Sequence, residues 1–174
     1  MDTFLDILKY ILPSTIVFLA VYFVLKKQLE VQLKSQVIKG RQANQSTVLP
    51  IRLQAYERMV LLLERISPQN LVMRANNNSN VTAGQLHQEL LAAIRAEYEH
   101  NQTQQIYISQ GAWEAVKRAK EETIKIINIS ASKVNDNAKG VDLSRMVLEL
   151  CMKIDKMPTQ IAVDYLKEEA RLFF

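Results

Sequence analysis

The chain has 174 residues, which suits one ordinary domain and a short appendage. A hydrophobic fraction of 48% excludes a fully disordered chain, and a single cysteine excludes an internal disulfide framework and a zinc site built on several thiolates. The formal net charge of +4 is local, because residues 26–45 carry five basic side chains and one acidic side chain, whereas residues 46–174 carry 16 basic and 15 acidic side chains. The nearly neutral bulk of the chain argues against a nucleic-acid-binding protein.

The first segment contains an uncharged apolar run, YILPSTIVFLAVYFVL, at residues 10–25. As a helix extended back to Phe4 this segment would be about 33 Å long, enough to cross a hydrocarbon core of about 30 Å. No small-residue cleavage site follows Leu25, so we expect residues 1–25 to be an uncleaved transmembrane anchor. The alternative is a buried helix of a soluble protein. The basic residues after the run predict a periplasmic N-terminus and a cytoplasmic remainder.

The next segment, residues 26–48, is predicted to be a basic amphipathic stem followed by a linker. Leu29, Leu33 and Val37 recur at a spacing of four residues, as on one face of a helix. Its basic side chains could contact anionic lipid headgroups or could act only as a topology signal. These side chains are Lys26, Lys27, Lys34, Lys39 and Arg41. The polar run GRQANQST at 40–47 is expected to interrupt the helix.

Residues 49–174 predict a cytoplasmic bundle of four to five helices, so the expected fold class is all-α. Pro50 should begin the first helix of the bundle. Thr82, with Gln85 three residues later, has the pattern of a capping box, and Ser109 should cap the following helix. The last two helices are expected to begin with caps at 142 and 159. Residues 106–108, Ile-Tyr-Ile, are predicted to form a short extended connector.

Signals for catalysis are weak. Glu97 and His100 have the Glu-x-x-His spacing of di-iron bundles, but the residue three positions before the other histidine, His87, is Gly84, which cannot bind a metal. Cys151 lies on an apolar helical stripe, so we expect it to pack rather than to act as a nucleophile. The sequence contains no phosphate-binding glycine loop and no nucleophile elbow. We therefore expect a protein that is not an enzyme and that holds no metal and no cofactor.

Polar and aromatic side chains near the expected helix ends are candidates for binding a partner. The polar side chains could instead form internal capping networks, and the aromatic ones could pack in the core. The candidate residues are Arg52, Tyr56, Arg58, Glu97, His100, Tyr107 and Trp113.

The sequence resembles an uncharacterised family of small, inner-membrane-anchored helical proteins of Bacteroidota. The segments that carry the resemblance are LPIRLQAYERMVLLLERISPQNLVMR (49–74), EYEHNQTQQIYIS (97–109) with the following Trp113, and IAVDYLKEEARLFF (161–174). The resemblance implies a setting at the bacterial inner membrane and no particular chemistry.

Together these features predict a non-enzymatic accessory or scaffold subunit of an inner-membrane complex. It would engage another membrane protein through its transmembrane helix and its helical domain; self-association is left open, and no nucleic acid is expected. One alternative is a membrane tether for ribosomes or nucleic acid that uses the basic stem, which predicts steeply salt-dependent binding. A second alternative is an enzyme with a site near Glu97 and His100.

Overall fold

The computed structural model describes the backbone of residues 2–75 and 81–173, and within them the side chains of residues 18, 19, 21–32, 48–75 and 81–173. The described backbone is helical and contains no β-strand, only an isolated bridge between Thr82 and Lys139. The prediction of an all-α fold is therefore confirmed for this part of the chain. The helices are α1 (Asp2–Ile66), α2 (Pro68–Ala75), α3 (Ala83–Asn101), the 3-10 helix η1 (Gln102–Ile106), α4 (Gln110–Ala131), α5 (Gly140–Met152) and α6 (Pro158–Arg171).

The chain divides into two compact units between Val48 and Leu49. The first unit is the N-terminal part of α1, and all of its described side chains from 21 to 32 are exposed. None of the helices in the described residues combines the length and the apolar character needed to cross a bilayer. Most side chains of the anchor predicted at residues 1–25 lie outside those that the structure describes.

The predicted helix break at 40–47 and the predicted helix start at Pro50 are wrong, because the backbone is helical from Asp2 to Ile66. The run at 40–47 contains one glycine and no proline. A glycine inside a helix costs only about 1 kcal/mol relative to alanine, which the neighbouring helix-forming residues can offset. Pro50 removes one backbone hydrogen bond and is accommodated inside the helix rather than at its beginning.

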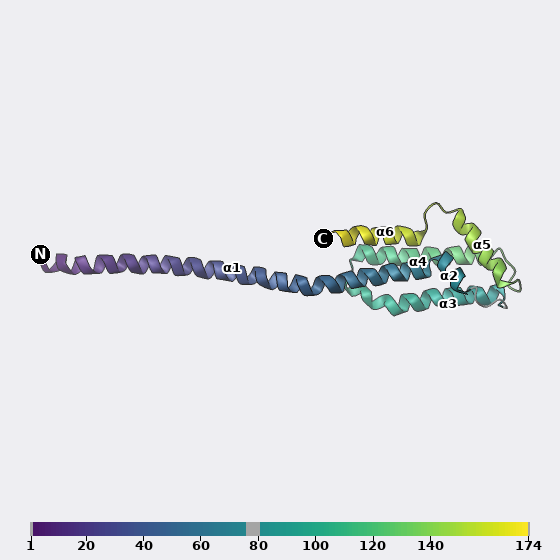
Figure 1. Cartoon of the computed structure of the whole chain (residues 1–174), viewed down its shortest axis with the longest axis horizontal. Coiled ribbons are helices and arrows are strands. Elements are labelled where there is room, and N and C mark those ends of the chain that lie inside the picture. Colours follow the sequence, from purple (N-terminus) through teal and green to yellow (C-terminus); the bar gives the residue numbers. More distant parts are fainter. Residues whose placement is uncertain (1, 76–80, 174) are drawn as a thin grey trace. The chain divides into compact units, whose positions relative to one another are not determined.

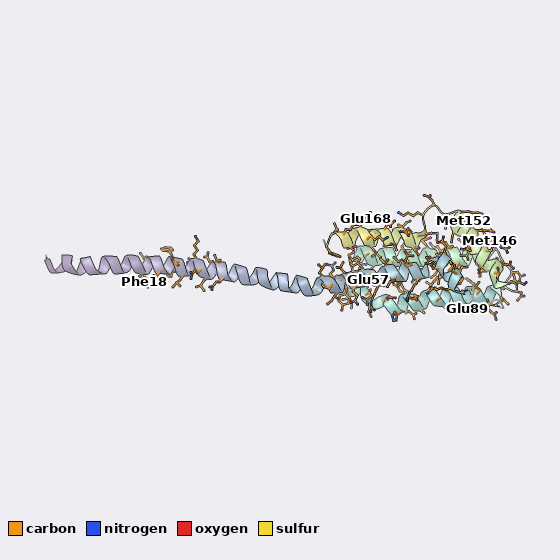
Figure 2. All side chains as sticks on the ribbon, in the orientation of Figure 1. Phe18, Glu57, Glu89, Met146, Met152 and Glu168 are labelled. Atoms are coloured by element: carbon orange, nitrogen blue, oxygen red, sulfur yellow. The ribbon has the colours of Figure 1, made fainter. Side chains whose placement is uncertain are left out.

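The second unit, residues 49–173, is a helical bundle around one apolar core (Figure 1). In its described part it holds six α-helical segments, the end of α1 and α2 to α6, where four to five were expected. The helix α4 contacts α2, α3, α5 and α6. Charged side chains such as Glu57, Glu89 and Glu168 lie on the outside of the bundle (Figure 2). The largest fully buried side chains are Met59, Leu62, Leu63, Ile66, Leu86, Leu90, Ile94, Val116, Ile127, Leu143, Val147 and Leu166.

Two of the predicted helix starts are confirmed. The Thr82 side chain accepts a hydrogen bond from the Gln85 backbone N–H, and the Gln85 side chain accepts one from the Thr82 N–H, which completes the capping box of α3. The Ser109 hydroxyl accepts a hydrogen bond of 3.0 Å from the Ala112 backbone N–H at the start of α4. Both contacts satisfy backbone donors that a helix leaves free in its first turn.

The other predicted boundaries differ from the structure. Asp142 lies inside the first turn of α5, which begins at Gly140, and its carboxylate is favoured there by the helix dipole. Pro158 opens α6 instead of ending the preceding helix, so Thr159 is a helical residue rather than a cap. The fixed φ of proline suits this first position. The segment before Ser109 is not extended: η1 continues directly from α3 to Ile106, and Tyr107 forms a turn.

The buried face of α4 contains an unsatisfied polar atom. Thr123 is fully buried, and its Oγ1 has no hydrogen-bond partner among the described residues. An unpaired buried hydroxyl costs about 1–3 kcal/mol, and an apolar group of similar shape avoids that cost. We therefore expect Thr123→Val to raise the free energy of unfolding by about 1 kcal/mol, measured by urea denaturation. The matched control is Thr103→Val at an exposed position of η1, which should change stability by less than about 0.5 kcal/mol. A destabilised Thr123→Val variant would contradict this prediction.

Candidate functional site

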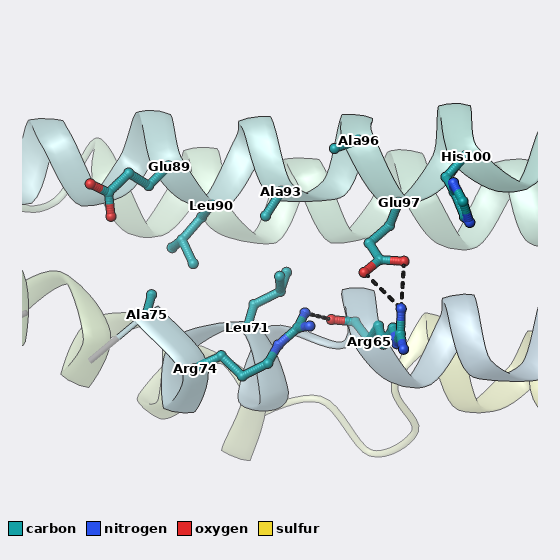
Figure 3. A pocket seen from close by; sticks show the side chains of 10 residues that line it. All are labelled: Arg65, Leu71, Arg74, Ala75, Glu89, Leu90, Ala93, Ala96, Glu97 and His100. Carbon is teal, nitrogen blue, oxygen red and sulfur yellow. Dashed lines mark hydrogen bonds and ion pairs between the residues drawn. The ribbon is translucent and has the colours of Figure 1, made fainter. Parts of the chain in front are cut away.

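An open cleft of about 600 Å³ lies between α3 on one side and α2 with the end of α1 on the other (Figure 3). Its floor is apolar, and its rim carries basic and acidic side chains. The floor residues are Leu71, Ala75, Leu90, Ala93 and Ala96, and the charged or ionisable residues are Arg65, Arg74, Glu89, Glu97 and His100. Leu71 and Leu90 are buried, and the alanines are the accessible part of this floor. Accessible apolar atoms beside charged side chains are the usual composition of a binding surface.

The two sides of the cleft are joined by an ion pair. Nη1 of Arg65 on α1 lies 3.3 Å from Oε1 and 3.4 Å from Oε2 of Glu97 on α3. The Arg65 side chain is 57% exposed, so the pair contributes less than about 1 kcal/mol to stability. Nη2 of Arg74 donates a hydrogen bond to the backbone oxygen of Arg65, one of the free carbonyls at the end of α1. The contact leaves the remaining N–H donors of Arg74 next to the cleft.

The structure places both Glu97 and His100 at this cleft, one turn apart on α3 (Figure 3). His87, the other histidine, lies elsewhere: its Nε2 is 2.8 Å from Oδ1 of Asn128 on α4. Within the residues that the structure describes, no three His, Cys, Asp or Glu side chains are grouped in a way that could hold a metal ion.

A second group of candidate residues forms internal contacts at the end of the bundle where residue 49 enters. Nε of Arg52 donates a 3.2 Å hydrogen bond to the backbone oxygen of Tyr107, and the guanidinium lies 4.4 Å from the centre of the Phe173 ring. Tyr56 is 3% exposed; its hydroxyl accepts a 3.3 Å hydrogen bond from the Ser109 N–H, and its ring meets Phe173 edge-on. These contacts tie α1, the turn after η1 and the C-terminal segment together.

The remaining aromatic and basic candidates are divided between core and surface. Trp113 is 6% exposed and stacks on Tyr98 with ring centres 5.3 Å apart, and Nζ of Lys120 lies 4.2 Å from the centre of the Tyr98 ring. Tyr107 is partly exposed and Arg58 is exposed, so these two side chains are accessible. Trp113 therefore packs in the core, which is the alternative given above for the aromatic candidates.

The basic stem belongs to the first unit. Lys26 and Lys27 are exposed. Lys34, Lys39 and Arg41 lie outside the side chains that the structure describes.

Two buried groups have pKa values that differ from their usual ones. Burial raises the pKa of the Tyr56 hydroxyl, and the nearby Glu169 carboxylate adds to that rise. Burial also raises the pKa of the Cys151 thiol, which keeps the thiol protonated at neutral pH. Cys151 is 4% exposed in the apolar core, as predicted from its helical stripe.

Sequence reasoning found Glu97 and His100 but missed the rest of the cleft. The signal on α3 was present, because residues 89, 93, 96, 97 and 100 follow the helical spacing of one face. The contribution of Arg65 and Arg74 could not be inferred, since no sequence pattern relates them to a carboxylate 32 positions away from Arg65.

Removing the Tyr56 hydroxyl tests the internal role of that residue. Tyr56→Phe leaves the Ser109 N–H without its acceptor, so we expect the free energy of unfolding to fall by about 1 kcal/mol at pH 8. The raised pKa means that the unfolded chain ionises first, so the stability contributed by the hydroxyl is lost as pH rises above about 10. The difference in the free energy of unfolding between the wild type and Tyr56→Phe, measured by urea denaturation, should therefore become smaller between pH 8 and pH 11. Tyr107→Phe is the control and should change stability little, because Arg52 contacts only the backbone of Tyr107. A stability difference between the wild type and Tyr56→Phe that grows at high pH would contradict the internal role of the Tyr56 hydroxyl.

Comparison with known proteins identifies a family that the chain matches. The chain matches a family of unknown function, DUF7935, over residues 2–173. No protein of curated function and no solved structure matches it. Because the match covers nearly the whole chain, the protein belongs to the family DUF7935.

Proposed function

We propose that this protein is a non-enzymatic accessory or scaffold subunit of a bacterial inner-membrane complex. A transmembrane helix within residues 1–25 holds it in the membrane with the N-terminus in the periplasm, and residues 49–174 bind another membrane protein from the cytoplasmic side. The uncharged run at 10–25 and the basic residues after it support this topology. The exposed Lys26 and Lys27 are suited to anionic headgroups at the membrane surface.

The single observation that carries the binding role is the cleft between α3 and α2. The alanines of its floor are accessible, whereas Leu71 and Leu90 are buried, and its rim offers both signs of charge. Along α3 the cleft extends from Glu89 to His100, about 16 Å of helix, which matches three turns of a partner helix. Arg74 can pair with a carboxylate of the partner because, among the described residues, no acidic side chain lies within 4.0 Å of its guanidinium.

In-cell photo-crosslinking of the full chain tests this proposal. A photoreactive residue in place of Ala93 lies on the cleft floor, whereas the same residue in place of Arg95 lies on the exposed, nearly opposite side of α3. We expect one membrane protein to crosslink from position 93 and not from position 95, at a fixed stoichiometry after purification in mild detergent. Crosslinks to lipid alone, or equal crosslinking from both positions, would count against a partner in the cleft.

Charge reversal at the cleft gives an independent readout. Arg74→Glu should abolish co-purification of that partner, because it removes the free cation beside the cleft. Arg95→Glu makes the same change in net charge away from the cleft and should leave co-purification intact. Circular dichroism of both variants checks that the bundle remains folded.

A further inference from the structure

A second apolar surface lies on a different side of the bundle, between α4 and α6. It is a groove of about 430 Å³ whose floor consists of small residues, Gly111, Ala115, Ala119 and Ala162. Beside the floor stand two large apolar side chains of α6, Ile161 at 53% and Tyr165 at 43% exposure. The surface therefore combines an exposed ridge with a hollow whose accessible floor is Gly111 and Ala115, whereas Ala119 and Ala162 are buried.

The Tyr165 side chain lies close to the backbone of α4 at position 111. A Cβ at Gly111 would collide with the hydroxyl oxygen of Tyr165, so the end of that side chain would have to shift if residue 111 were not glycine. The floor residues have at most one methyl group each, which allows another helix to approach closely. A ridge of large side chains can enter such a hollow. The Ile161 and Tyr165 ridge of the same molecule lies beside it.

The charges on the α4 side of the groove alternate. Glu114, Arg118 and Glu122 line the groove at intervals of four residues, so consecutive turns carry opposite signs. Glu114 pairs with Lys117 and Glu122 with Lys125, whereas Arg118 has no carboxylate within 4.0 Å in the part of the chain that the structure describes. The row therefore retains a cation that another molecule can pair with.

This surface is complementary to itself. When a second α4 lies antiparallel, with the two-fold axis midway between positions 114 and 118, each Glu114 faces the Arg118 of the other copy. An axis at position 118 would instead place Arg118 opposite Arg118 and Glu114 opposite Glu122. An axis midway between positions 118 and 122 pairs each Arg118 with Glu122 of the other copy in the same way. Exposed ion pairs add little affinity, but they favour these two registers over the one with its axis at position 118.

We propose that the groove between α4 and α6 is the surface through which two copies of this chain associate. The Ile161 and Tyr165 ridge and the small-residue floor lie in the contact between the two copies, and pairing of Arg118 with Glu114 or Glu122 of the other copy favours the antiparallel arrangement. The interface uses α4 and α6, whereas the cleft proposed for a membrane partner uses α1, α2 and α3. Each proposal can therefore fail without the other.

Sedimentation velocity of the full chain in mild detergent tests the ridge. The wild type should sediment as a dimer at micromolar concentration. Tyr165→Lys and Ile161→Lys should each raise the dimer dissociation constant by at least about tenfold, since each places a charge in the centre of an apolar contact. Met152→Lys is the matched control, because Met152 is 85% exposed on α5, outside the groove, and this variant should remain a dimer.

A charge swap tests the register. Arg118→Glu should weaken the dimer because it brings like charges together in both favourable registers, and Arg118→Glu combined with Glu114→Arg should restore it. A monomeric wild type overturns the proposal, as does a dimer that survives Tyr165→Lys, since that dimer would be held by another part of the chain. Failure of the double variant to recover the dimer overturns the proposal as well. So does a groove that becomes shielded from solvent only when liposomes or a different polypeptide are added.

Discussion

The bundle depends on burying the apolar face of the last turns of α1. Met59, Leu63 and Ile66 are completely inaccessible, and they recur at intervals of three or four residues, so one face of the helix lies in the core. At about 25 cal/mol per Å² of apolar surface, burial of this face contributes several kcal/mol, far more than any single polar contact of the unit. This packing fixes which side chains of α1 reach the neighbouring elements.

The polar contacts of α1 follow from that packing, and they differ in burial. At the beginning of the second unit, Tyr56 is buried against Phe173, and its hydroxyl accepts the Ser109 N–H. At the end of α1, Arg65 is mostly exposed and meets Glu97 across an open cleft. The first set of contacts is closed and holds the structure together. The second set is accessible, so its donors and acceptors can exchange partners with another molecule at little cost.

Local patterns predicted much of the fold because they act over three or four residues. The capping box at Thr82 and the cap at Ser109 were readable because donor and acceptor are three positions apart. The helix through 40–47 and the start of α5 at Gly140 were not, since weak local preferences there are overridden by the adjoining helix or by tertiary contacts. Gly140, for example, donates its N–H to the Val81 carbonyl, a contact between segments that no local pattern reveals.

The candidate site was only half predictable for the same reason. Glu97 and His100 were readable from one helix, whereas the cleft they line requires α2 and the end of α1 to lie beside α3. The groove between α4 and α6 was missed entirely, because Gly111 and Tyr165 are 54 positions apart and meet only in the folded chain. Each of the two surfaces places accessible apolar area beside exposed charge. Surfaces of this composition gain free energy when another protein covers them, and that gain is the physical basis for proposing that both bind other protein chains.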